Sequence, residues 1–146
     1  MMKPRRVFFL FIALLVLLTA FRIGSLYRSI GTFSGVVRGL LGHSLVLSES
    51  DINVGRVSPG EAFTRCVRLH NNSKRPIRLL GNSATCSCLS ILHVDELDSG
   101  ESSYINLTIT PSAREDSFVH IVNLFTDMPG YERIYISIAG YVDSEP

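Results

Sequence analysis

The clearest strand pattern in the sequence is Ala62-Phe63-Thr64-Arg65-Cys66-Val67-Arg68-Leu69-His70. The apolar side chains of Phe63, Val67 and Leu69 fall on one face, and those of Thr64, Cys66, Arg68 and His70 fall on the other. This alternation has the two-residue period of a β-strand that is buried on one side only. We therefore predict a half-buried strand over residues 62–70.

Short apolar runs of the same kind continue on both sides of this strand. Turn signals separate them about every 8–12 residues, for example at Ser58–Glu61, Asp98–Glu101 and Asp127–Gly130. Regular spacing of this kind is typical of an all-β sandwich. The expected strands cover residues 44–47, 52–57, 62–70, 76–80, 91–94, 103–110, 118–126 and 132–142.

The N-terminus differs sharply from this region. A basic head at residues 1–6 precedes residues 7–21, which contain no charged side chain. This combination is typical of a secretory signal or a signal anchor. Extension to Leu26 gives the length of about 20 residues that a membrane-spanning helix needs, with Arg22 reaching to the interface. Because Leu18-Thr19-Ala20 is a poor cleavage site, an uncleaved anchor is favoured over a cleaved signal.

The basic head also predicts the orientation of the anchor. Lys3, Arg5 and Arg6 favour a cytoplasmic N-terminus, although further arginines flank the other side. We expect a single-pass membrane protein that contacts the membrane through residues 7–26, with its C-terminal domain on the periplasmic side.

Residues 27–44 are rich in glycine and serine. The spacing of Gly31, Gly35 and Gly39 would also fit a close helix–helix contact. Because glycine disfavours helices in water, we interpret the segment as a flexible tether. The predicted organisation is a basic head and anchor or signal segment (1–26), a Gly/Ser-rich tether (27–44) and a β-sandwich domain (45–146).

Charge excludes one class of function. The chain has a net charge of +1, but residues 1–44 carry six basic and no acidic side chains, so the remaining domain is mildly acidic. Nucleic-acid binding depends on neutralising phosphates with basic side chains. We expect no nucleic-acid partner.

The cysteines are the main candidates for chemistry. Cys86 and Cys88 lie one residue apart between two expected strands, and Cys66 is the third cysteine of the chain. The close pair would suit a soft metal ion or thiol–disulfide exchange. A structural disulfide is the alternative in an oxidising compartment, either as a tight Cys86–Cys88 ring or between Cys66 and one of the pair. Free thiols are a further possibility.

Other chemistry finds little support. His70, His93 and His120 could add metal ligands, but strand alternation does not bring them together with the cysteines. Serine, histidine and aspartate are plentiful, yet the Gly-x-Ser-x-Gly elbow of many hydrolases is missing from the sequence. We therefore predict no enzymatic activity, no catalytic residues and no cofactor.

The order of several short motifs resembles a known family. The motifs are Ser58-Pro59-Gly60-Glu61, Val67-Arg68-Leu69-His70-Asn71, Pro76-Ile77, Cys86-Ser87-Cys88, Ser99-Gly100-Glu101 and Ile138-Ala139-Gly140-Tyr141-Val142. Over about residues 51–142 the chain resembles the bacterial domain-of-unknown-function family 1573, an immunoglobulin-like module related to the ASPM–SPD-2–Hydin domains. Ser87 stands where the family has glycine, and Leu89 where it has threonine.

The resemblance implies an immunoglobulin-like antiparallel β-sandwich of about seven strands outside the cytoplasm, often tethered to a membrane, without an established activity. Together with the anchor, it predicts a binding or scaffolding module that holds a protein or envelope component near the membrane. We expect the binding surface at residues 83–89, which we call the cysteine segment, and at the neighbouring turn at residues 71–75. The alternative function is metal handling or thiol redox chemistry at Cys86 and Cys88.

Overall fold

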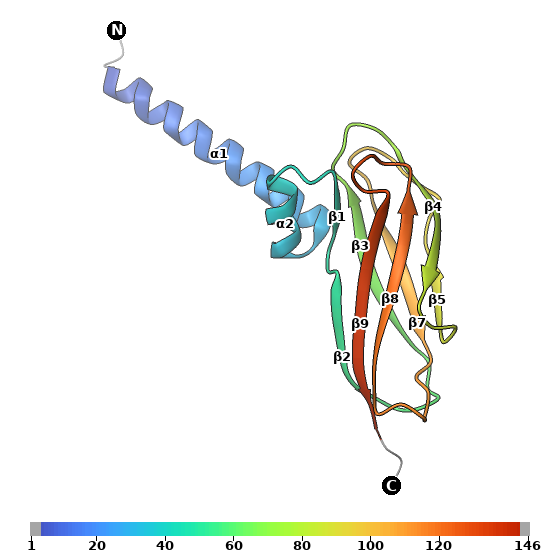
Figure 1. Ribbon diagram of the computed structural model, residues 1–146. Helices are drawn as coiled ribbons and strands as arrows, with labels where there is room; N and C mark the ends of the chain where they lie inside the picture. Colours follow the sequence, from blue (N-terminus) through green and yellow to red (C-terminus); the bar gives the residue numbers. More distant parts are fainter. Residues whose placement is uncertain (1–3, 144–146) are drawn as a thin grey trace.

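The computed structural model describes residues 4–143 as two N-terminal helices and a β-sandwich (Figure 1). Helix α1 (Pro4–Ile30) projects from one side of the sandwich, and the short helix α2 (Phe33–Leu40) folds back beside its C-terminal part. In the part of the chain that the structure describes, everything after α2 is strand or connection. The predicted all-β sandwich with a preceding apolar helix is confirmed.

Two sheets face each other. The four-stranded sheet has the order β1-β3-β7-β5 and contains β1 (Leu45–Leu47), β3 (Phe63–Asn71), β7 (Ser102–Ile109) and β5 (Leu89–Leu92). The five-stranded sheet has the order β2-β9-β8-β4-β6 and contains β2 (Asp51–Val57), β9 (Arg133–Val142), β8 (Ser117–Thr126), β4 (Ile77–Ala84) and β6 (Glu96–Leu97). The described residues thus form nine strands, one more than the eight ranges expected from the alternation, because the two-residue β6 is added; the family resemblance implied about seven.

The chain passes from the four-stranded to the five-stranded sheet at residues 48–50, between β1 and β2. Strand β1 pairs antiparallel with β3, whereas β2 pairs parallel with β9. The Ser48 amide donates to the carbonyl of Arg68, and the Ser137 amide donates to the carbonyl of Ser50. Because each end of the crossing is bonded to a different sheet, this short connection holds the two layers together.

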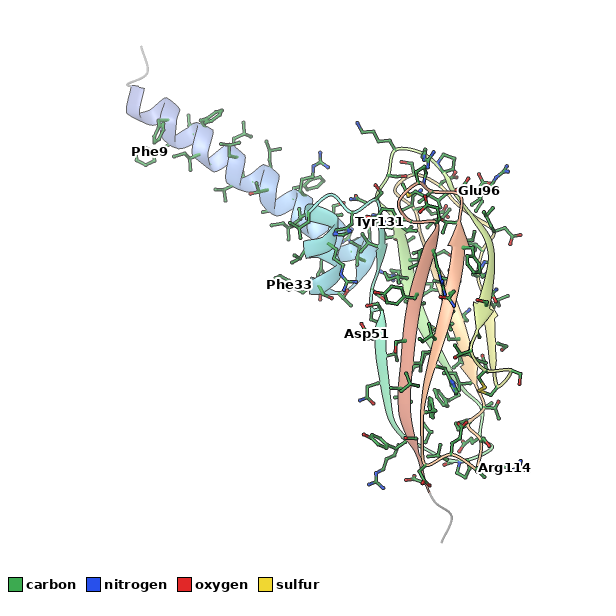
Figure 2. All side chains as sticks on the ribbon, viewed as in Figure 1. Phe9, Phe33, Asp51, Glu96, Arg114 and Tyr131 are labelled. Atoms are coloured by element: carbon green, nitrogen blue, oxygen red, sulfur yellow. A yellow bond between two sulfur atoms is a disulfide. The ribbon has the colours of Figure 1, made fainter. Side chains whose placement is uncertain are left out.

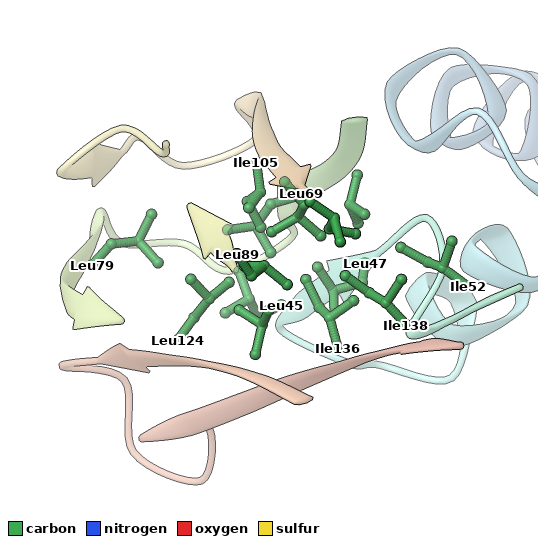
Figure 3. Packing of buried hydrophobic residues seen from close by; sticks show 14 of the residues in the cluster. Leu45, Leu47, Ile52, Leu69, Leu79, Leu89, Ile105, Leu124, Ile136 and Ile138 are labelled. Carbon is green, nitrogen blue, oxygen red and sulfur yellow. The ribbon is translucent and has the colours of Figure 1, made fainter. Parts of the chain in front are cut away.

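The core lies between the sheets. Its buried side chains are almost all aliphatic and come from the alternate positions that the sequence predicts, including Val67 and Leu69 of β3 and Leu107 of β7. Figure 3 shows Leu45, Leu69, Ile105, Leu124 and Ile136 meeting in this layer. Such burial supplies the main driving force for folding.

Asn71 lies inside one end of the sandwich and bonds the backbone of the segments around it. Its side chain is fully buried. The Nδ2 group donates to the carbonyls of Arg75, Leu97 and Asp98 at 2.8, 3.0 and 3.1 Å. Its Oδ1 atom accepts from the amide and hydroxyl of Ser73. One side chain therefore satisfies the backbone of both the 71–76 turn and the segment after β6.

Residues 27–44 differ from the expected flexible tether. They contain the last turn of α1 and all of α2, and Ile30 and Val36 are buried. Gly35 serves a close contact between the two helices instead. A Cβ atom on Gly35 would lie 2.2 Å from Cγ2 of Ile30, whereas one on Gly39 would make an ordinary contact with Leu26 at 3.5 Å. Glycine therefore allows α2 to approach α1 closely.

Side chains of the sandwich also form hydrogen bonds with the C-terminal end of α1. Arg68 Nη1 donates to the carbonyls of Arg28 and Ser29 at 3.1 and 3.3 Å. Ser102 Oγ donates to the Ser29 carbonyl at 2.8 Å. The last carbonyls of a helix lack partners within the helix, so these bonds cap α1. We call this set of contacts the helix junction.

Candidate functional site

The candidate site is built around a disulfide between Cys86 and Cys88. It lies in the connection from β4 to β5, where the chain passes from one sheet to the other. The Cα atoms of the two cysteines are 5.2 Å apart, and the Cys88 amide donates to the Cys86 sulfur at 2.9 Å. Both cysteines are half-buried, whereas Ser87 between them is exposed. The pair is therefore accessible from one side.

Strand register brings His120 to this disulfide. Ala84 of β4 pairs with Val122 of β8, and the Thr85 amide donates to the carbonyl of Ile121. Continuing this antiparallel register by one more residue places Cys86 opposite His120. In the structure His120 Nε2 lies 3.4 Å from the sulfur of Cys88.

The ring of Phe118 packs against the His120 ring. The two rings stack with centroids 5.1 Å apart and an interplanar angle of 18°. Phe118 lies opposite Gly140 of β9, where a Cβ atom would be 2.8 Å from Phe118 Cζ and 2.6 Å from Val54 Cγ2. The absence of a side chain at Gly140 thus makes room for Phe118, on which His120 rests.

The three cysteines that the sequence singles out do not form one cluster, because only Cys86 and Cys88 are bonded to each other. Cys66 is a free and exposed thiol, so of the two disulfides that the sequence left open, the one between Cys66 and one of the pair does not form. Its side chain points away from the core, as the alternation of β3 requires. The tight Cys86–Cys88 ring forms instead.

The other histidines lie elsewhere. His93 contacts Asn82 and its neighbouring backbone, and His70 contacts Ser102 at the helix junction. Burial lowers the pKa of His70, and a hydrogen bond with the Glu101 backbone opposes this effect in part. Only His120 of these three joins the cysteines, and the sequence signal for it was a histidine on the inward face that Phe118, Val122 and Leu124 share.

The turn at residues 71–75 is not next to the cysteine segment. Leu89 pairs with Ile109, which pairs with Phe63 at the start of β3, whereas Asn71 ends that strand. Eight residues of strand span about 26 Å. The expected joint surface is therefore wrong, because the two parts lie toward opposite ends of β3.

A different surface stands out on the outer face of the five-stranded sheet. Exposed apolar or aromatic side chains occupy Val119, Ile121 and Phe125 of β8 and Tyr135 and Tyr141 of β9. Val119 and Tyr135 are each more than 60 % exposed. Charge is sparse here, since Arg133 is the only charged residue among the outward positions of these two strands. We call these five residues the outer apolar face.

A cavity of about 780 Å³ lies between α1, α2 and the sandwich. Its walls include Leu15 and Leu18 of α1 together with His70, Asn72 and Gly100 of the sandwich. This cavity is separate from the disulfide, which does not line it. The cavity lies where α1 extends away from the sandwich (Figure 2).

Comparison with known proteins supports the fold but no single family. No family model and no curated protein sequence matches the chain. A solved protein of unknown function from Porphyromonas gingivalis has a TM-score of 0.61 at 16 % identity, covering 66 % of this chain and 46 % of that one. A PapD-like (ASH) domain of human CEP192 has a TM-score of 0.58 at 11 % identity, covering 70 % and 87 %. The YadV chaperone has a TM-score of 0.52 at 18 % identity, covering 69 % and 53 %.

These similarities support the immunoglobulin-like β-sandwich fold. The chain spans less than half of the Porphyromonas protein, and it also resembles about a third of the Vibrio cholerae VesB protease, with a TM-score of 0.57 and 15 % identity. At such identities the likeness concerns the fold alone. Membership of the domain-of-unknown-function family 1573 stays a prediction.

Proposed function

We propose that this protein is a membrane-tethered binding or scaffolding module that presents its sandwich to a partner protein on the periplasmic side of the membrane. The helix junction is the observation that carries the proposal. A side chain of β3 and one of β7 both bond the end of α1, so the helix and the sandwich form one continuous body. Such a body would place the sandwich at a defined distance from the membrane and in a defined orientation to it.

The apolar helix supports the tether. Residues Phe8–Ile30 form a stretch of 23 residues that is long and apolar enough to cross a membrane. At 1.5 Å per residue it is about 35 Å long, slightly more than the hydrocarbon core. Its large apolar side chains, Phe9 among them, are exposed around the helix (Figure 2). A solvent-exposed helix of this composition is stable when lipid covers it.

The outer apolar face is the surface that we assign to the partner. Exposed aromatic and aliphatic residues with little charge are the composition of interface centres. A patch of this kind on a folded domain marks an interaction site. The occupant that fits is a second polypeptide with an apolar, uncharged contact surface. The chaperone and PapD-like domains among the structural neighbours have the same fold, which supports the assignment by analogy.

The free thiol of Cys66 provides a test of the topology. In spheroplasts that contain the full chain, a membrane-impermeant maleimide should label Cys66 without permeabilisation, because its side chain is exposed and the other two cysteines are bonded. A Cys66→Ser variant is the matched control. Labelling that requires permeabilisation would place the sandwich in the cytoplasm and refute the periplasmic assignment.

Photo-crosslinking tests the surface. A photoreactive phenylalanine analogue at Tyr135 should yield an adduct of discrete mass with a second protein, whereas the same analogue at Leu92, an exposed apolar position on the other sheet, should not. Equal adducts at both positions, or none at either, would refute the outer apolar face as the binding surface. An adduct with the mass of two copies would reassign the face to self-association.

Thiol–disulfide exchange is a second candidate function, favoured by the distance of 3.4 Å between His120 Nε2 and the Cys88 sulfur. A dithiol protein would attack the Cys86 sulfur, the Cys86–Cys88 bond would break, and Cys88 would leave as a thiolate. The second thiol of the partner then resolves the mixed disulfide, so that the partner is oxidised and both cysteines become thiols. The imidazole of His120 lies where the leaving thiolate forms and can donate a hydrogen bond or a proton to it.

The rate of opening tests this candidate. His120→Ala should slow the opening of the disulfide by dithiothreitol at least about tenfold, as loss of a proton donor does. His93→Ala, which removes an exposed imidazole elsewhere, should leave the rate unchanged. Mass spectrometry after alkylation counts the thiols. Equal rates in the two variants would show that His120 takes no part.

A further inference from the structure

The described residues bring three potential metal ligands to one point. The sulfur atoms of Cys86 and Cys88 and a ring nitrogen of His120 all lie within 4.8 Å of one another. We infer that, once the disulfide is open, these three side chains bind one monovalent copper ion. The inference goes beyond partner binding and rests on the thiol–disulfide candidate only in requiring an open bond.

The donor set selects the ion. Two thiolates are soft ligands that favour Cu(I), and imidazole also suits copper. Zinc is the other thiophilic ion, but structural zinc sites use four protein ligands in a tetrahedron. Only three ligand groups of these types gather in the described residues. A set of two sulfurs and one nitrogen therefore fits Cu(I) better than structural zinc.

The scaffold holds the ligands in place before any ion arrives. The Thr85 amide bonds the Ile121 carbonyl and the Ile121 amide bonds Thr85 Oγ1, which ties the cysteine segment to β8 beside His120. The Cys88 carbonyl accepts from the Thr110 amide at 3.0 Å, which fixes the other end of the segment. The stack on Phe118 orients the imidazole. Ligands on such supported positions need little rearrangement to bind.

The oxidation state of the cysteines controls the site. In the disulfide each sulfur is bonded to the other and is not a thiolate, so the metal site does not exist. A dithiol reductant transfers two electrons, becomes a disulfide itself and leaves two protein thiols. Binding of Cu(I) then releases the two thiol protons to solvent, and the copper keeps its oxidation state. Copper capture is thereby confined to the reduced protein.

Competition for Cu(I) tests the inference. The full chain in detergent, with Cys66→Ser to remove the free thiol, is reduced, separated from the reductant without oxygen and titrated against the Cu(I)–bicinchoninate complex. We expect one copper per chain. Cys86→Ser and Cys88→Ser should each weaken binding at least about a hundredfold, and His120→Ala at least about tenfold. His93→Ala is the matched control and should bind as the parent does.

X-ray absorption at the copper edge adds a direct readout. The parent should show two sulfur neighbours and one nitrogen neighbour, and His120→Ala should lose the nitrogen. Circular dichroism of each variant establishes that it is folded. Lack of stoichiometric copper binding by folded, fully reduced protein would overturn the site. Unchanged affinity and spectra in His120→Ala would overturn the three-ligand set, and tighter binding of Zn²⁺ than of Cu(I) under the same competition would overturn the choice of ion.

The thiol count separates this test from the redox candidate. Alkylation of the Cys66→Ser protein before and after reduction establishes that the two site thiols were free during the titration. Failure to bind copper with both thiols free refutes the metal site and leaves thiol exchange intact. Copper binding in a protein whose disulfide resists protein dithiols supports the metal site and refutes exchange.

Discussion

Replacing Arg68 with methionine should release α1 from the sandwich without unfolding either. The guanidinium donates to the carbonyls of Arg28 and Ser29, contacts the hydroxyl of Tyr104 and lies 5.0 Å from the centre of that ring. Methionine keeps an unbranched apolar stem and removes only the charged head. The variant therefore isolates the cap on the helix.

The size of the effect follows from these contacts. A hydrogen bond from a charged group contributes about 1.5–3 kcal/mol when it is shielded from water, and a cation near a helix C-terminus adds about 0.3–1 kcal/mol. Arg68 is half-buried, so we take about 2 kcal/mol for the whole set. That free energy corresponds to a roughly 30-fold change in the opening equilibrium.

Hydrogen exchange of the full chain in lipid nanodiscs measures this opening. The amides of Gly31 and Val36, which bond Tyr27 and Thr32, should exchange about 30-fold faster in Arg68→Met. Amides in the β8–β9 ladder should be unaffected. Arg65→Met, an exposed arginine on the same strand, is the matched control. Unchanged exchange at Gly31 and Val36 would refute the helix junction as the element that joins α1 and the sandwich into one body.

Four further outcomes are expected. Gly140→Ala should lower the free energy of unfolding by about 1–3 kcal/mol in a denaturant titration, because its Cβ atom would press on Phe118; an unchanged midpoint would contradict this packing. Asn71→Ala should cost about 3 kcal/mol or more in the same titration, since it leaves several buried backbone groups without partners; a loss below about 1 kcal/mol would contradict that role. Stability should fall as the pH drops below about 6.5, because the unfolded chain takes up a proton that buried His70 resists, and His70→Gln should flatten this dependence. Reduction of the Cys86–Cys88 bond should lower the melting temperature by about 5–15 °C and leave the domain folded at about 25 °C, since so short a loop contributes roughly 1–2 kcal/mol; loss of the fold on reduction would make the bond structural.

The strands could be predicted because their alternation records a physical asymmetry. Val67 and Leu69 are buried while Cys66 is exposed, as the two-residue period requires. The same rule put His70 on the outward face correctly but did not predict that this side chain is buried. A helix can cover an outward-facing residue of a sheet, but the two-residue alternation of the strand does not indicate that cover. Glycine spacing in α2 did indicate this cover, but glycine serves linkers and close contacts alike.

The site could be predicted only in part for a related reason. Cys86 and Cys88 are neighbours in sequence, so their meeting needs no knowledge of the fold. His120 reaches them through the register of β4 against β8, and a register is set by a whole ladder of pairs, Ala84 with Val122 among them. A sequence lists the strands without giving their pairing. The inward position of His120 was readable, but its partner was not.

The parallel pairing of β2 with β9 has a mechanical consequence. Asp51 faces Ser137 and Val57 faces Val142, so the anchor-side end of β2 and the terminal end of β9 lie at opposite ends of one ladder. A pull between the membrane and the far end of the sandwich would load these strands in shear, with every bond of the ladder sharing the force. An antiparallel pair pulled from the same edge would instead unzip one bond at a time. Under such a pull the parallel pair of β2 and β9 would therefore resist separation better than an antiparallel pair in the same place.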